Sequence, residues 1–312
     1  MKFFNYRKIP KKYRGSAIAI GNFDGLHIGH QKVFKKTKNF AKKNNIKFGV
    51  LTFNPLPVMF FNKQVKNYRL TLENEKLKLF KKFGVDFVIN IKFNNSFSKI
   101  KAEDFIKKII YKNINPSLLA VSNNFRFGNK REGNVVLLKR LGKKYNYKLL
   151  NVTPHKYKNK IVSSTRIRNS INKGEVYLAN NLLSRTWFVE GIVKKGKKLG
   201  RKLGYPTCNI SIKNFVLPKN GIYSVKVLID KKKYLYSGIG YFGFRPTFLG
   251  NEAFLEINIF GINRNLYKKK IRVYFLKFIR GDKKFKNSAQ LVQQMNKDVI
   301  FAKKGLKTKL VL

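Results

Sequence analysis

The hydrophobic pattern of the chain changes near residue 184, and this change constrains the fold more than any other feature of the sequence. Between residues 16 and 183, short apolar runs alternate with segments whose apolar residues recur at helical spacing. Such alternation is typical of a parallel sheet with helices on both of its faces. We therefore predict an α/β domain over residues 1–183. Its strands are expected at 16–23, 46–53, 85–93 and 118–122, and its helices at 30–43, 74–84, 102–113 and 133–146.

From residue 184 onward the chain consists mainly of short β-rich runs separated by Gly, Pro, Asn or Lys. Six such runs with close turns predict a small antiparallel barrel. A helix is expected to follow, beginning at Ser288. Residues 184–312 are therefore predicted to form a second, all-β domain with a terminal helix. The six strands are expected at 186–196, 205–212, 221–230, 232–243, 252–261 and 269–280.

The chain is strongly basic, with 69 Lys and Arg against 14 Asp and Glu and a formal net charge of +55. Such an excess attracts anionic partners, which include nucleic acids, anionic membranes and phosphorylated small molecules. The lysines are spread over nearly every segment, and the chain is also rich in Asn, Ile, Phe and Tyr, which A+T-rich codons encode. We therefore interpret the charge as a general property of the chain and expect no specific nucleic-acid partner.

Cysteine usage and the length of the apolar runs limit the cellular compartments in which we expect the protein. The single cysteine, Cys208, excludes an internal disulfide and a cysteine-based zinc site, and we expect it to be a small packed side chain rather than a nucleophile. One unpaired thiol fits a reducing compartment. The start of the chain lacks the apolar core of a secretory signal, and no run approaches the 18 or so apolar residues of a spanning helix. We expect a cytoplasmic protein with no membrane partner.

Two of the three histidines, His27 and His30, lie three residues apart in the stretch GNFDGLHIGHQ (21–31). The stretch follows the first apolar run, and its glycines let the backbone approach a ligand closely. The helix that follows would present its N-terminal N–H groups to an anion. Imidazoles at such a turn can donate hydrogen bonds to phosphate oxygens, where charge develops as phosphorus becomes five-coordinate. The stretch therefore indicates phosphate binding.

Two other interpretations of this histidine pair are possible. As metal ligands, His27 and His30 have no nearby cysteine or pair of carboxylates, so they make a poor ligand set. As side chains packed in a turn they would need no ligand, which is the usual explanation for a lone histidine. The clustering of glycine and histidine ahead of a helix favours phosphate binding over both.

The same stretch resembles the HxGH signature of nucleotidyltransferases related to class I aminoacyl-tRNA synthetases. With GNFDG ahead of it, it is similar to the version in the bacterial bifunctional riboflavin kinase/FMN adenylyltransferase (FAD synthetase) family. Three further matches follow in the family's order: LTFNPLP (51–57), VSNNFRFGNKREG (121–133) and VSSTRIRNSINKGEV (162–176). The chain departs from the family pattern with Leu56 where His is common, Ser122 where Gly is usual and Asn124 where Asp is frequent.

The resemblance implies roles for residues of the first domain. His27 and His30 would be catalytic residues that contact the ATP phosphates. Asn124, Arg126 and Gly128 would bind the FMN substrate. The other ATP-binding residues implied in this domain are Asn22, Phe23, Asp24, Gly25, Ser163, Ser164, Thr165 and Arg168.

The second domain is similar to riboflavin kinase in GKKLGRKLGYPTCN (196–209), NGIYSV (220–225), GFRPTF (243–248) and FLEINI (254–259). By that resemblance Glu256 is the general base, which takes the proton from the terminal ribityl hydroxyl of riboflavin as it attacks the γ-phosphate. Thr207 and Asn209 would coordinate Mg²⁺, a cation that prefers oxygen ligands. The segment from Gly196 to Gly204 would form a flexible, basic flap over the ATP phosphates. The ATP-binding residues implied in this domain are Gly196, Gly200, Arg201, Gly204, Thr207 and Asn209.

We therefore predict a bifunctional transferase that uses Mg²⁺ and ATP. Its second domain would phosphorylate riboflavin to FMN, and its first domain would transfer AMP from ATP to FMN, giving FAD and pyrophosphate. One alternative is a riboflavin kinase whose adenylyltransferase domain is impaired at Ser122 and Leu56. An alternative from another class is a basic nucleic-acid-binding protein on a related scaffold. The expected partners are riboflavin, FMN and ATP, and the sequence predicts no oligomeric state.

Overall fold

The computed structural model describes residues 1–196, 199–230, 234–247 and 250–305. The chain divides into two compact units. The first comprises Met1–Lys66 and Thr71–Ser163, and the second comprises Asn67–Leu70 and the chain from Ser164 onward. The second unit thus begins at Ser164, earlier in the chain than the predicted domain boundary at residue 184. The expected division of the two functions between residues 183 and 184 stays a prediction.

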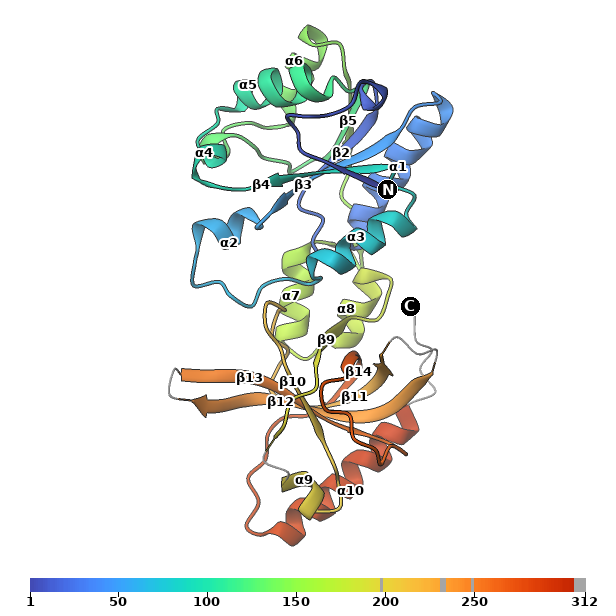
Figure 1. Ribbon diagram of the computed structural model, residues 1–312, viewed down its shortest axis with the longest axis vertical. Helices are drawn as coiled ribbons and strands as arrows, with labels where there is room; N and C mark the ends of the chain where they lie inside the picture. Colours follow the sequence, from blue (N-terminus) through green and yellow to red (C-terminus); the bar gives the residue numbers. More distant parts are fainter. Residues whose placement is uncertain (197–198, 231–233, 248–249, 306–312) are drawn as a thin grey trace. The chain divides into compact units, whose positions relative to one another are not determined.

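The first unit contains one parallel sheet with the strand order β1-β4-β3-β2-β5-β6 (Figure 1). Every neighbouring pair in this sheet is parallel, which confirms the predicted sheet type. A small antiparallel hairpin, β7 and β8, lies apart from it. The strands are β1 (Lys2–Phe4), β2 (Ala17–Ile20), β3 (Phe48–Asn54), β4 (Phe87–Lys92), β5 (Leu118–Ser122), β6 (Lys148–Val152), β7 (Lys156–Tyr157) and β8 (Lys160–Ile161).

Helices cover both faces of this sheet, as predicted. On one face Ile18 and Ile89 pack in a core with residues of α5, η2 and α6, and on the other Ala19 and Val88 pack with residues of α1 and α3. Because β2 and β3 are covered on both faces, their sequences are almost continuously apolar. The helices are η1 (Lys11–Tyr13), α1 (Ile28–Lys43), α2 (Pro57–Phe61), α3 (Glu73–Lys82), α4 (Asn95–Ser98), α5 (Ala102–Asp104), the π-helical η2 (Phe105–Ile114), η3 (Asn129–Arg131) and α6 (Val135–Lys144).

The second unit contains an antiparallel sheet with the strand order β10-β13-β12-β11-β14-β9. Just beyond β9, Lys194 N donates to the carbonyl of Asn209 in β10 at 2.9 Å, and this bridge brings the two edge strands together. The six strands thus form a nearly closed barrel, which confirms the prediction. They are β9 (Phe188–Ile192), β10 (Cys208–Ser211), β11 (Gly221–Ile229), β12 (Leu235–Thr247), β13 (Gly250–Ile259) and β14 (Lys270–Arg280).

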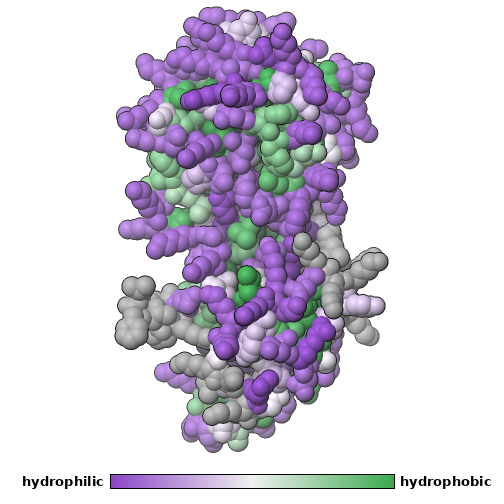
Figure 2. All heavy atoms as spheres, in the orientation of Figure 1, coloured by the Kyte–Doolittle hydropathy of each residue, from purple (hydrophilic) through white to green (hydrophobic). Residues whose placement is uncertain are grey.

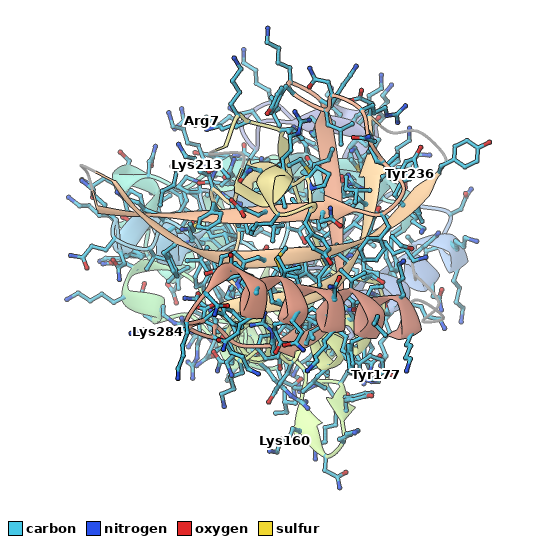
Figure 3. All side chains as sticks on the ribbon, turned by 90° about the horizontal axis from the view of Figure 1, so that it is seen from below. Arg7, Lys160, Tyr177, Lys213, Tyr236 and Lys284 are labelled. Atoms are coloured by element: carbon cyan, nitrogen blue, oxygen red, sulfur yellow. The ribbon has the colours of Figure 1, made fainter. Side chains whose placement is uncertain are left out.

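The predicted terminal helix is α10 (Ser288–Gly305), which lies across the barrel strands (Figure 3). Arg280, at the end of β14, donates through Nε to both carboxylate oxygens of Asp298 at 3.0 Å. Asp298 is buried, and a forked guanidinium–carboxylate pair of this kind holds both partners in one orientation. The pair therefore fixes α10 on the barrel. The unit's other helices are α7 (Ser164–Asn172), α8 (Val176–Leu183) and α9 (Leu199–Lys202).

Basic side chains are spread over the surface. Arg7, Lys160, Lys213 and Lys284 project outward from separate segments (Figure 3), and hydrophilic residues cover most of the face shown in Figure 2. Within the part of the chain that the structure describes, no helix combines the length and the apolar character that crossing a bilayer requires.

Candidate active sites

The turn between β2 and α1 carries the histidine pair of the first unit. His27 is the N-cap of α1, and its Nδ1 accepts a hydrogen bond from the backbone N–H of His30 at 3.3 Å. The two imidazole rings stack with their centroids 3.6 Å apart. The first turn of α1 contains no acidic residue, so the positive end of the helix dipole is not neutralised there. The turn thus combines two imidazoles with a helix terminus that favours anions.

Packing sets the positions of these rings. Phe23 is buried and presents its ring edge-on to His30, with centroids 5.2 Å apart. A Cβ atom on Gly29 would lie 3.1 Å from two atoms of the His27 ring, so a larger residue between the histidines would press on His27. His27 is only 4% exposed, and His30 is the more accessible of the two. The predicted Phe23 therefore lies in the core, from which it supports His30.

The residues ahead of the histidines are held by hydrogen bonds within the first unit. The Asp24 carboxylate is buried and accepts from the backbone N–H of Thr71 at 3.2 Å. The carbonyl of Asn22 accepts from the Thr52 hydroxyl at 3.2 Å. Gly25 has a φ of +80°, a conformation that favours glycine. These contacts fix the path of the loop that leads into the histidine turn.

The predicted FMN-binding residues follow β5. Asn124 and Arg126 are exposed, and the Asn124 Oδ1 accepts from the Ser122 hydroxyl at 2.8 Å. The serine that replaces the usual glycine therefore orients the side chain of Asn124. Gly128 has a φ of +75°, and a Cβ atom there would lie 2.7 Å from the backbone of Ala102. Only glycine fits at that position.

A row of aromatic rings, which the sequence analysis missed, begins beside the predicted FMN-binding residues. Phe125 and Phe127 stack with centroids 5.6 Å apart, and the row continues through Phe105 and Phe97 to the far end at Phe61, which is 68% exposed. Its eight members are Phe125, Phe127, Phe105, Phe97, Phe53, Phe93, Phe60 and Phe61. The run of phenylalanines after LTFNPLP was the only sequence signal for it.

The predicted triphosphate-binding residues lie around the start of α7. Ser163 ends the first compact unit, and Ser164 and Thr165 open α7 in the second. Arg168 is buried, its guanidinium lies 3.7 Å from the centre of the Tyr68 ring, and its Nε donates to the Tyr68 carbonyl at 2.8 Å. Arg168 therefore anchors the segment that contains Tyr68, which the sequence analysis did not foresee.

In the second unit, strand register brings two predicted residues together. Asn209 of β10 is the direct partner of Glu256 in β13, so their side chains lie on the same face of the barrel. Neighbouring residues of β13 are buried inside, whereas Glu256 points outward and is half-buried. Asn209 is 8% exposed. The predicted base and one predicted magnesium ligand are therefore neighbours.

Tyr241 of β12 is the direct partner of Glu256 on its other side, and the sequence analysis missed it. Burial raises the pKa of its hydroxyl, and the carboxylates of Asp282 and Glu256 raise it further. The phenol therefore stays protonated at neutral pH and can donate a hydrogen bond to a carboxylate. Only the pairing of β12 with β13 reveals this neighbour.

Two glycines of the predicted flap lie against the oxygen-bearing side chains of Thr207 and Asn209. A Cβ atom on Gly196 would lie 2.5 Å from Nδ2 of Asn209, and one on Gly200 would lie 3.3 Å from the Thr207 hydroxyl. The backbone at Gly196 and at Gly200 thus passes close to Asn209 and Thr207, respectively. Arg201 and Gly204 lie on the described part of this loop, whereas Lys197 and Lys198 lie outside the described residues.

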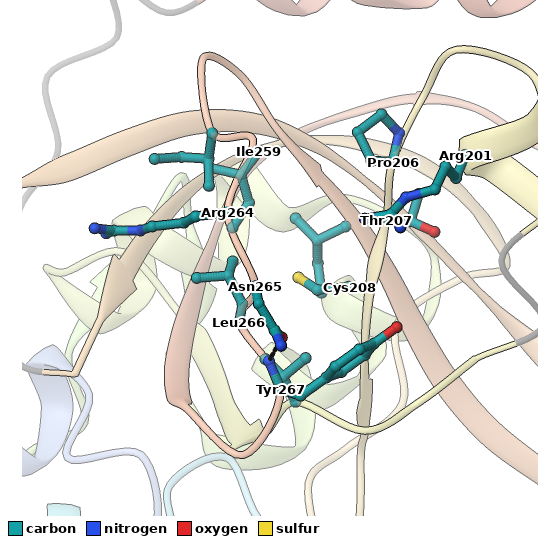
Figure 4. Close-up of a pocket in the computed structure, with 12 residues that line it drawn as sticks. Arg201, Pro206, Thr207, Cys208, Ile259, Arg264, Asn265, Leu266 and Tyr267 are labelled. Carbon is teal, nitrogen blue, oxygen red and sulfur yellow. Dashed lines mark hydrogen bonds between the residues drawn. The ribbon is translucent and has the colours of Figure 1, made fainter.

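A pocket of about 280 Å³ opens beside this loop (Figure 4). Its wall is apolar at Ile259 and Leu266, while Thr207 and Arg264 supply polar groups. Cys208 forms part of the wall, and burial raises the pKa of its thiol to about 12. The side chain is therefore buried and packed, as expected, and its thiol is protonated at neutral pH.

The first unit is an α/β unit with a histidine turn at a helix N-terminus. The second is a barrel in which the oxygen-bearing side chains of Thr207 and Asn209 lie beside glycines. These features together define a two-domain transferase that acts on nucleotides. Residues 9–166 match the family model described as FAD synthetase, and residues 183–306 match the one described as riboflavin kinase. The chain belongs to the bifunctional riboflavin kinase/FMN adenylyltransferase family.

Curated relatives carry the same description over nearly their full length. The protein of Buchnera aphidicola subsp. Schizaphis graminum is 41% identical, covering 96% of both chains. That of Escherichia coli K12 is 32% identical, covering 96% of this chain and 95% of the relative. A crystal structure from Streptococcus pneumoniae described as a macrolide-efflux protein has a TM-score of 0.85 and 28% identity, covering 97% of this chain and 99% of that one. That likeness confirms the fold of each unit, and the efflux description belongs to that protein.

The chain is thus a riboflavin kinase and an FMN adenylyltransferase, and its substrates are riboflavin, FMN and ATP. This identification confirms the predicted pair of activities. It is favoured over both an impaired adenylyltransferase and a nucleic-acid-binding protein on a related scaffold.

Proposed function

We propose that residues 1–183 carry adenylyl transfer and residues 184–312 carry riboflavin phosphorylation. The match of the FAD synthetase model to residues 9–166 and of the riboflavin kinase model to residues 183–306 supports this division. Each of the two segments then catalyses one complete ATP-dependent reaction.

In adenylyl transfer, His27 and His30 hydrogen-bond the ATP phosphates at the N-terminus of α1. A phosphate oxygen of FMN attacks the α-phosphorus, and the bond to the β-phosphate oxygen breaks to release pyrophosphate. The imidazoles stabilise the charge that develops on the phosphate oxygens. The stacked ring pair and the absence of acid in the first turn of α1 support this role. The loop of Asn22, Phe23, Asp24 and Gly25 supports the nucleotide from one side.

FMN is bound by Asn124, Arg126 and Gly128 beside the aromatic row. The exposed guanidinium of Arg126 suits the FMN phosphate, and aromatic faces suit the flat isoalloxazine ring. Ser163, Ser164 and Thr165 contact the triphosphate through hydroxyls and through backbone N–H groups at the start of α7. Arg168 takes part from the same helix.

In riboflavin phosphorylation, Glu256 accepts the proton of the terminal ribityl hydroxyl while that oxygen attacks the γ-phosphorus and ADP leaves. The register of Asn209 against Glu256 is the single observation that carries this assignment. The flap, with Gly196, Gly200, Arg201 and Gly204, covers the phosphates. The pocket beside it, of about 280 Å³, accommodates the nucleotide.

Mg²⁺ fits the donor groups at this position. Thr207 and Asn209 offer a hydroxyl and an amide oxygen, which this cation accepts as ligands. Among the described residues no cluster of three His, Cys, Asp or Glu could hold a metal ion, so phosphates and water would complete the coordination shell. When bound, the ion would neutralise charge on the transferred phosphoryl group. The presence of a single, buried cysteine, Cys208, supports a cytoplasmic location.

The test is turnover of the purified chain with riboflavin, ATP and Mg²⁺, followed by chromatography of the flavins. The expected result is FMN first and FAD later, with both steps stopped by a chelator that removes Mg²⁺. Truncated chains are not needed, because FMN can be supplied directly to isolate the second step. Retention of both reactions after His30→Ala and Glu256→Gln would overturn the site assignments.

A further inference from the structure

One lysine of the first unit is fully buried. Lys76 on α3 is 1% exposed, and its Nζ lies 3.1 Å from Oε2 of Glu73. The same ammonium donates to the Thr52 hydroxyl at 3.4 Å. Burying an ammonium is unfavourable unless it is paired and hydrogen-bonded, so these contacts account for its place in the core.

The contacts of Lys76 continue to the loop ahead of the histidine turn. The Thr52 hydroxyl accepts from Lys76 and donates to the carbonyl of Asn22 at 3.2 Å, and Thr52 is fully buried. On the other side, Oε1 of Glu73 accepts from Nδ2 of Asn90 at 3.2 Å. Thr52 and Asn90 are direct partners in β3 and β4. The Glu73–Lys76 pair therefore connects β3 and β4 to Asn22, two residues beyond the end of β2.

A second pair on the same helix shows that α3 does not need a buried cation. Lys78 and Glu75 have the same three-residue spacing and lie 3.0 Å apart, but Lys78 is 60% exposed. The buried pair is also close to neutral overall, so it adds little attraction for phosphate. Its effect is instead geometric, because a hydroxyl held from one side by an ammonium has its proton directed to the other.

We propose that Lys76, Glu73 and Thr52 are positioning residues for adenylyl transfer, which fix the Asn22 carbonyl and so the loop that leads into His27. This inference rests on the proposed role of His27 and His30. The loop from Asn22 to His27 is short, so displacement at its start is transmitted to the imidazoles. A displacement of about 1 Å at a reacting centre is enough to lower a rate by up to about 10²-fold.

The test compares four variants of the full chain with supplied FMN. Thr52→Val removes the hydroxyl and keeps the branched shape, and Thr52→Ser restores it. The double variant Glu73→Gln with Lys76→Met removes the charges together, because a lone buried charge could prevent folding. Lys78→Met is the matched control on the exposed side of α3. The readouts are kcat and KM for ATP in FAD formation, FMN affinity from fluorescence, and riboflavin phosphorylation as a check on the fold.

Thr52→Val and the double variant are expected to lower kcat for FAD formation about tenfold or more, with FMN affinity and riboflavin phosphorylation unchanged. Thr52→Ser and Lys78→Met are expected to match the wild type. Unchanged FAD formation in Thr52→Val and in the double variant would overturn the inference, as would equal losses in both reactions. His30→Ala distinguishes a failure of the positioning role from a failure of the proposed histidine site. If this variant leaves FAD formation intact, the proposed site itself is wrong.

Discussion

The two candidate sites are built from the fold in different ways. In the first, the histidine pair lies on one short turn, whose backbone leads from β2 into the N-terminus of α1. In the second, the candidate groups come from neighbouring antiparallel strands, where register sets Asn209 against Glu256 and Glu256 against Tyr241. The position of the histidine pair thus depends on the path of one loop, and the arrangement of Asn209, Glu256 and Tyr241 depends on the pairing of three strands.

The chemistry of the two reactions explains why we propose a carboxylate base for the barrel site alone. Riboflavin attacks through a neutral hydroxyl, whose proton must leave as the bond to phosphorus forms. FMN attacks through a phosphate, which is largely ionised at neutral pH because its second pKa is about 6. Adenylyl transfer therefore needs donors for the phosphates, and we propose that His27 and His30 supply them together with the N-terminus of α1.

Glu256→Gln is expected to give the largest effect on one reaction alone. Without a positioned base, riboflavin phosphorylation should fall about 10²–10⁴-fold, while FAD formation from supplied FMN continues at the wild-type rate. Chromatography of the flavins from each starting substrate measures both. Glu252→Gln, an exposed glutamate on the same strand, is the matched control. A common loss of both reactions in Glu256→Gln would contradict two separate sites.

His30→Ala is expected to have the opposite selectivity. Removing one donor to a charged transition state costs about 10²–10³-fold in kcat, so FAD formation should fall by that factor and riboflavin phosphorylation should not change. The same flavin chromatography applies. His155→Ala tests the third histidine, which lies outside the turn, and should leave both rates unaltered. Full FAD formation in His30→Ala would remove the histidine turn from the reaction.

Gly29→Ala tests how closely the first site depends on its backbone. The added methyl would lie 3.1 Å from the His27 ring and displace it. FAD formation should fall roughly tenfold, as expected for a displacement smaller than 1 Å, with riboflavin phosphorylation unchanged in the same protein sample. Steady-state rates with supplied FMN measure the loss. Normal rates would show that the histidine stack tolerates a shift.

Glu190→Gln is expected to have the smallest effect, on stability of the barrel alone. Burial raises the pKa of Glu190, but hydrogen bonds from Lys270 and Arg272 outweigh it, so the pKa is lowered overall. A lowered carboxyl pKa contributes stability above the ordinary value of about 4.3, and that stability is lost as pH falls through the lowered pKa. The variant should be less stable by about 1 kcal/mol at pH 7.

Urea unfolding followed by circular dichroism at several pH values measures this difference. The difference in the free energy of unfolding between Glu190→Gln and the wild type should decrease as the solution is acidified below about pH 4.3, because the wild-type carboxylate then takes up a proton. A gap that stays constant across this range would show that the carboxylate charge is not responsible.

The sequence analysis predicted the central strands of the parallel sheet but missed its edge strands. The fully buried β2 and β3 have continuous apolar runs, so their period was easily recognised. The edge strands β1 and β6 were missed, because most of their residues are exposed or half-exposed and carry a mixed polar pattern. An edge strand needs pairing on one side only, and its sequence is correspondingly less constrained.

The motifs indicated which segments belong to the sites, whereas contacts between segments had to come from the structure. Lys76 and Lys78 are indistinguishable in the sequence, yet one is buried and the other exposed. Tyr241 carries no motif of its own and is recognised only through its register with Glu256. Arg168 was predicted from a motif, but its stacking on Tyr68 depends on a segment about a hundred residues away.

The position of the only cysteine in the sequence offers a single-site reporter for the barrel. Cys208 lies in the wall of the barrel pocket and is protonated at neutral pH, so an alkylating reagent should meet it only when the barrel opens. The labelling rate of the native chain therefore reports how often the barrel opens, without any engineered probe. A nucleotide that occupies the pocket should slow that rate in proportion to its occupancy.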